Sequence, residues 1–82
     1  MSATIKQVNE MMPIVRERIA HIDPCSLSDA LHVCDIVCAE QGMTEDDAGH
    51  LLMCMRVMGW LIEFNDEGDV VANRNDPSKD RP

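Results

Sequence analysis

The chain has 82 residues, 45% of them hydrophobic, so it is long enough for one small domain with a packed core and too apolar for a disordered chain. Fifteen acidic residues against seven basic ones give a net charge of −8, which disfavours binding to nucleic-acid phosphates and favours a basic protein surface. The first ten residues contain no apolar signal core, and the longest strictly apolar run, at residues 51–55, is too short to span a membrane. We therefore expect a cytoplasmic protein.

The first helix is predicted from a capping box formed by Thr4 and Gln7. Apolar residues then recur every three or four positions in one stripe: Ile5, Val8, Met12, Val15, Ile19 and Ile22. The stripe favours packing into the protein's own core, and the alternative is a homodimer formed through it. Because proline inside a helix loses a hydrogen bond and clashes with the preceding turn, we expect a break or bend between Asn9 and Pro13.

Two further helices are predicted after Asp23, which precedes a proline and therefore ends the first helix. Ser26 and Asp29 cap the second helix, which is apolar nearly all round, and Gly42 ends it. Thr44 caps the third helix, whose first turn carries three acids that suit the positive end of the helix dipole. Its predicted inward face consists of Ala48, Leu51, Leu52, Met55 and Met58, and Gly59 follows it.

A β-hairpin is predicted at residues 60–72, with strands at 60–64 and 69–72 joined by a polar turn that contains Gly68. Residues 1–72 are therefore expected to form one mainly α domain, a three-helix bundle with a C-terminal two-stranded β-hairpin. Residues 73–82 are polar and contain two prolines, so we expect a disordered, flexible C-terminal tail.

The run from His50 to Val71, a helix followed by glycine and a hairpin, resembles the recognition helix and wing of small winged-helix domains. The resemblance covers roughly half the chain and implies a winged-helix-like fold that reads DNA with this helix and hairpin. DNA-binding members carry basic and polar groups on those exposed faces, whereas Arg56 is the only cation between residues 44 and 69 of this chain. Seven acids stand there instead: Glu45, Asp46, Asp47, Glu63, Asp66, Glu67 and Asp69.

These acids predict a non-catalytic regulator or inhibitor that binds a protein with a basic surface, such as one that binds nucleic acid. In size, charge and lack of motifs the chain resembles small phage-encoded and mobile-element-encoded inhibitors, including anti-CRISPR and anti-restriction proteins. One alternative is that the acids only solvate a surface, and another is a winged-helix DNA-binding regulator. We expect no enzyme, because the chain contains no phosphate-binding glycine loop, nucleophile elbow or HExxH motif.

A metal site is a further alternative, because four potential ligands lie in two pairs with helical spacing. Cys34 and Cys38 fall on the second predicted helix, and His50 and Cys54 on the third. Residues four apart share a helix face, so the two pairs would form a Cys3His zinc site if those faces met, giving a metal-binding or redox-sensing domain. Buried cysteine is common without a metal, so we favour no cofactor.

Overall fold

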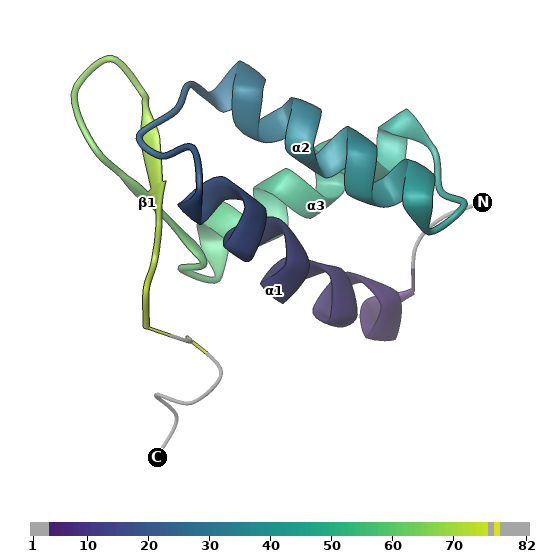
Figure 1. The fold of residues 1–82 in the computed structure, drawn as a ribbon. Coiled ribbons are helices and arrows are strands. Elements are labelled where there is room, and N and C mark those ends of the chain that lie inside the picture. The colour runs from purple at the N-terminus through teal and green to yellow at the C-terminus, as the bar shows by residue number, and fades with distance from the viewer. Residues whose placement is uncertain (1–3, 76, 78–82) are drawn as a thin grey trace.

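Three helices and a hairpin make up the computed structural model, which describes residues 4–75 and 77 (Figure 1). The helices are α1 (Ile5–Ala20), α2 (Leu27–Glu40) and α3 (Glu45–Val57), and they are followed by strands β1 (Leu61–Glu63) and β2 (Val70–Ala72). The strands pair antiparallel, with Leu61 opposite Ala72 and Glu63 opposite Val70. The predicted fold class, mainly α with a C-terminal hairpin, is therefore confirmed.

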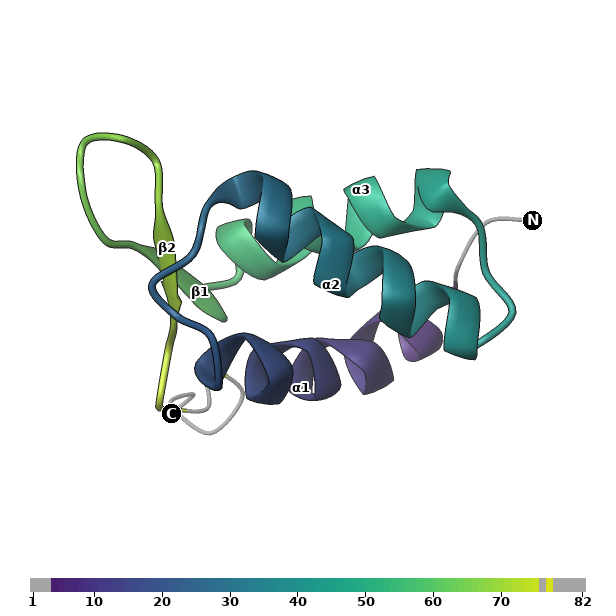
Figure 2. The same ribbon diagram turned by 45° about the horizontal axis from the view of Figure 1, so that its top comes forward.

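The three helices pack on one another, and the hairpin stands across one end of them, far from the connection between α2 and α3 (Figure 2). The helix termini follow the local signals of the sequence. Thr4 and Gln7 form the predicted capping box, with hydrogen bonds of 2.9 and 3.1 Å, and the Ser26 hydroxyl accepts the N–H of Asp29 at 3.1 Å. Gly42 follows α2 with a φ of +76°, which a residue with a side chain rarely adopts.

Helix α1 runs without interruption through Pro13, so the helix does not break there, and the alternative of a bend stays a prediction. Proline in a helix interior costs about 3 kcal/mol, because Asn9 loses the amide that would bond its carbonyl. The neighbouring side chains of Met11, Met12 and Val15 are all fully buried, and each contributes roughly 1.5–3 kcal/mol. The burial of the continuous stripe therefore outweighs the local cost of the proline.

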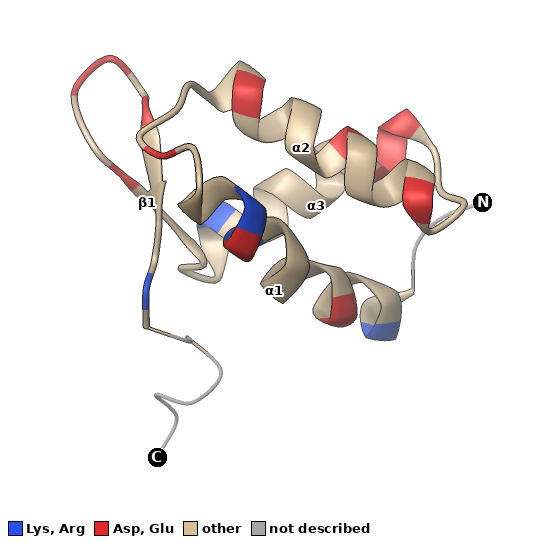
Figure 3. Ribbon diagram, viewed as in Figure 1, with Lys and Arg blue, Asp and Glu red and all other residues tan. Residues whose placement is uncertain are grey.

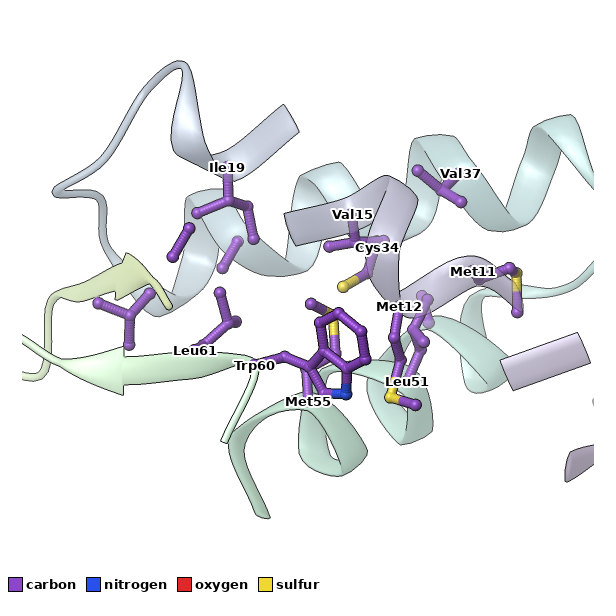
Figure 4. Packing of buried hydrophobic residues seen from close by; sticks show 14 of the residues in the cluster. Met11, Met12, Val15, Ile19, Cys34, Val37, Leu51, Met55, Trp60 and Leu61 are labelled. Atoms are coloured by element: carbon purple, nitrogen blue, oxygen red, sulfur yellow. The ribbon is translucent and has the colours of Figure 1, made fainter. Parts of the chain in front are cut away.

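The core takes side chains from all three helices and from the hairpin (Figure 4). It contains Val8, Met11, Met12, Val15, Ile19, Cys25, Ala30, Cys34, Val37, Cys38, Ala48, Leu51, Met55, Trp60, Leu61, Val70 and Ala72. Four members of the predicted α1 stripe are buried here, and only its end residues, Ile5 and Ile22, are exposed. A homodimer through this stripe would have to form without its four central residues.

Met58 is the one residue of the predicted α3 inward face that lies outside the core, with an exposed fraction of 42%. Ala48, Leu51 and Met55 are buried as predicted, and Leu52 packs against the core from a half-buried position. Met58 differs because α3 ends at Val57 and the chain turns away at Gly59, where φ is +83°. Helical spacing therefore no longer applies to it.

The hairpin is held against the loop between α1 and α2. Cys25 and Val70 exchange two backbone hydrogen bonds of 3.0 and 2.8 Å, so the loop adds a short third pairing to the edge of β2. The Asp23 carboxylate accepts the N–H of Ala72 at 2.9 Å and also contacts Arg74 at 3.1 Å. These contacts give the hairpin a fixed position relative to the helices.

The first residues of the predicted tail also belong to the fold. The Asn73 N–H donates to the carbonyl of Trp60 at 2.9 Å, and its side-chain amide donates to the carbonyl of Gly59 at 2.8 Å. Arg74 contacts Asp23, as described above. Two residues of the predicted tail, Asn73 and Arg74, therefore contact the folded domain, and residues 76 and 78–82 of that tail lie outside the described part of the chain.

Candidate functional site

The seven acids predicted to bind a partner separate into two groups in the structure (Figure 3). Glu45, Asp46 and Asp47 form the first turn of α3, whereas Glu63, Asp66, Glu67 and Asp69 belong to the hairpin. Helix α3 has 13 residues, which at about 1.5 Å per residue separates its two ends by roughly 20 Å. The structure therefore does not bring the seven acids onto one continuous surface.

The acids at the start of α3 are accounted for by the helix itself. Asp47 is only 7% exposed, and its carboxylate accepts the N–H of Thr44 at 3.2 Å and the Thr44 hydroxyl at 3.1 Å. Glu45 and Asp46 are exposed beside the unpaired N–H groups of the first turn, where negative charge is stabilised by the helix dipole. Asp47 thus has a structural role, and the other two acids suit helix formation.

Glu63 is the last residue of β1, and the other three acids of the hairpin lie on a turn that is fixed by its own hydrogen bonds. The Asn65 side chain accepts the N–H of Glu67 at 3.0 Å and of Asp69 at 3.2 Å, and it donates to the Asp69 carboxylate at 3.0 Å. Asp69 is therefore half-buried and engaged. Glu63, Asp66 and Glu67 extend into solvent, and none of the three forms an ion pair with another described residue. We call these three residues the hairpin acids.

Several basic residues in the described part of the chain contact groups other than the hairpin acids. Arg18 makes a bidentate contact with Glu40, with distances of 2.7 and 3.1 Å, and Arg74 contacts Asp23. The guanidinium of Arg16 lies 5.0 Å from the centre of the Trp60 ring, a cation–π geometry. These cations lie on or beside α1 and β2, so they do not neutralise the hairpin acids.

A groove of about 480 Å³ separates α3 from the hairpin. Its lining consists of Met53, Arg56, Val57, Leu61, Glu63, Gly68 and Val70. The strand register places Leu61, Glu63 and Val70 on the same face of the hairpin, because side chains two residues apart share a face. The groove therefore brings the hairpin acid Glu63 opposite the outer side of α3.

Sequence reasoning missed the α3 wall of this groove. Met53 and Val57 are 62% and 80% exposed, although both are large and apolar. The signal was present, since the two residues lie four apart and fall outside the predicted inward stripe. Such a pair indicates a second apolar strip on the helix. Arg56, noted as the only cation of this region, lies on the same wall.

The cysteines and histidine of the alternative metal site are not assembled. Cys34 and Cys38 are buried in the core, whereas His50 is exposed and contacts Cys54 of its own helix, with 3.6 Å between Nε2 and Sγ. Within residues 4–75 and 77, no three His, Cys, Asp or Glu side chains are grouped so that they could hold a metal ion. The two predicted pairs thus remain separate.

Burial also makes three of the thiols less reactive in redox chemistry. Burial raises the pKa of Cys34 to about 12, with smaller contributions from Cys38 and Asp35. Burial likewise raises the pKa values of Cys25 and Cys38. Because the thiolate is the form that binds metals and attacks disulfides, these three residues stay in their unreactive form near neutral pH.

Comparisons of this chain with models of known protein families, with curated proteins and with solved structures find no match. The resemblances to winged-helix domains and to small phage-encoded inhibitors therefore stay predictions. Among the described residues, no helix is long and apolar enough to cross a membrane.

Proposed function

We propose that this protein is a small, non-catalytic regulator or inhibitor that binds a basic surface of another protein through the hairpin acids. The observation that carries the proposal is that Glu63, Asp66 and Glu67 are exposed and have no ion-pair partner among the described residues. Glu63 stands on the paired strand β1, and Asp66 and Glu67 stand on a turn that its own hydrogen bonds fix. A rigid carboxylate array loses little conformational entropy when Lys or Arg side chains bind it.

The net charge supports the same partner class. A chain of charge −8 attracts a basic protein over long range, which speeds encounter and makes the association sensitive to salt. Basic protein surfaces commonly bind nucleic-acid phosphates, and carboxylates on the hairpin would compete for the same Lys and Arg side chains. The proposed mode of action is therefore to cover a nucleic-acid-binding surface.

The alternative is that the acids only solvate the surface, and it differs from the proposal in whether the positions of the acids matter. Solvating charge is interchangeable between exposed sites, whereas a binding surface depends on where the charge lies. The start of α3 and the hairpin turn allow this distinction, because each carries a pair of exposed acids. We also propose that the protein acts in the cytoplasm, where its four free thiols would stay reduced.

The test compares two variants with the same change in net charge. Asp66→Lys/Glu67→Lys reverses the hairpin, and Glu45→Lys/Asp46→Lys reverses the start of α3, with circular dichroism used to check that both remain folded. Each is immobilised beside the natural sequence and used to capture proteins from the cell of origin, followed by quantitative mass spectrometry. We expect a basic protein that is retained by the natural sequence and the α3 variant and lost from the hairpin variant. Equal retention by all three proteins, or equal loss from both variants, would reject the proposal.

A further inference from the structure

The α3 wall of the groove is apolar, which distinguishes it from the acidic surface around it. Met53 and Val57 lie one helical turn apart, so their exposed side chains stand next to each other on that wall. Single exposed apolar residues need no explanation, but a pair that lines a concave groove is typical of a contact surface. Methionine adds adaptability, because its unbranched side chain adjusts to the shape of a partner.

The opposite side of the groove is negatively charged. Glu63 lines it directly, and Asp66 and Glu67 immediately precede Gly68, another lining residue. Arg56 lies on the helix wall beside Met53 and Val57. The groove thus has an apolar wall with one cation along α3 and a negative rim along the hairpin.

From this arrangement we infer that the groove binds an amphipathic, basic helix of a partner protein. Apolar side chains of that helix contact Met53 and Val57, and its Lys or Arg side chains bind Glu63, Asp66 and Glu67. Helices commonly bind in grooves through an apolar face flanked by charged residues. The inference rests on the proposed function and adds to it the kind of segment that is bound.

The charge and the geometry favour this occupant over others. A second copy of the chain would bring two sets of hairpin acids together, and nucleic acid would place phosphates beside them; like charges oppose both. An added β-strand would find little to pair with, since β1 is only three residues long.

The test uses fluorescence anisotropy with two labelled synthetic peptides of about 18 residues, or five helical turns. One is an amphipathic helix of Leu and Lys, and the other has Ser in place of every Leu, so the charge is the same. We expect the Leu/Lys peptide to bind the natural sequence at least about tenfold more tightly, a difference of about 1.4 kcal/mol. Met53→Ser/Val57→Ser should remove this difference.

The matched control is Ile5→Ser/Ile36→Ser, which removes two exposed apolar side chains that do not line the groove. It should preserve the preference for the Leu/Lys peptide. If the preference survives in Met53→Ser/Val57→Ser, or is lost equally in the control, the inference is wrong.

Failure of the proposed function gives a different pattern. If both peptides bind equally and Asp66→Lys/Glu67→Lys abolishes the binding of both, the hairpin acids bind a basic partner and the apolar groove does not contribute. The inference would then be wrong and the proposed function would stand. If that charge reversal leaves the binding of both peptides unchanged, the inference and the proposed function are both rejected.

Discussion

The carboxylate of Asp23 accepts a hydrogen bond from the backbone N–H of Ala72, 49 residues later in the chain, at 2.9 Å. Asp23 lies in the loop between α1 and α2, and Ala72 is the last residue of β2. The contact therefore connects the helical bundle to the hairpin that carries the candidate surface. Since Ala72 is buried, water cannot easily replace the carboxylate.

We predict that Asp23→Ala destabilises the fold, because it leaves the buried N–H of Ala72 without an acceptor. An unsatisfied buried donor costs about 1–3 kcal/mol, measurable as a lower free energy of unfolding in urea. Asp23→Asn should cost less, because the amide oxygen can still accept the bond. Glu10→Ala, at an exposed site on α1, is the control and should change stability by less than about 0.5 kcal/mol. Equal effects of Asp23→Ala and Glu10→Ala would contradict the contact.

Neighbouring acids at the start of α3 should differ in their effect on stability. Asp47→Ala removes two hydrogen bonds to Thr44, each worth about 1 kcal/mol, so we expect a loss of about 2 kcal/mol. Asp46→Ala removes only a favourable interaction with the helix dipole, worth about 0.5 kcal/mol. Urea unfolding of the two variants checks this order. An equal loss in both would mean that Asp47 has no special structural role.

Replacing Pro13 with alanine should stabilise the protein. The alanine N–H can donate to the carbonyl of Asn9 and complete the hydrogen-bond ladder of α1, and the gain can reach about 3 kcal/mol. Thermal and urea unfolding would both show the increase. Unchanged or lower stability would show that the proline ring contributes packing that alanine cannot replace.

The buried thiol of Cys34 predicts a loss of stability at alkaline pH. Its pKa is raised from 9.0 to about 12 in the folded protein, so between these values the unfolded chain releases a proton that the folded chain retains. Proton release then favours unfolding. The free energy of unfolding is therefore unaffected by this thiol below pH 9, and it decreases as the pH rises from 9 towards 12. Urea unfolding at pH 8, 9 and 10 should therefore show a smaller decline for Cys34→Ala than for the natural sequence. Parallel declines would contradict the raised pKa.

The parts of this fold that could be predicted from the sequence depend on local interactions. Thr4, Ser26 and Gly42 act within a few residues of their own positions, so capping patterns and turn preferences located the helix ends. Pro13 was misjudged because its cost is local, whereas the burial that outweighs it comes from other helices. The contact between Asp23 and Ala72 could not be predicted for the same reason, because no local sequence pattern at either residue indicates the other.

The candidate site shows the same division between local and tertiary information. The composition indicated an acidic protein, but neighbouring positions in the sequence did not reveal that the length of α3 would separate the acids of its first turn from those of the hairpin. Asp47 was expected to bind a partner, and its burial became visible only in the structure. Met53 and Val57 were discernible as a second apolar strip, yet the groove they line also requires the hairpin to fold back beside them.

Carbodiimide cross-linking tests most directly whether the hairpin acids contact a basic partner. This reagent joins carboxylates to lysines only when they are in contact, and mass spectrometry of the partner complex isolated from the cell of origin identifies the joined residues. We predict cross-links from Glu63, Asp66 and Glu67 to partner lysines, with Glu45 and Asp46 left unmodified by the partner. Cross-links that come instead from Glu45 and Asp46, or evenly from acids over the whole surface, would show that the hairpin acids are not the contact surface.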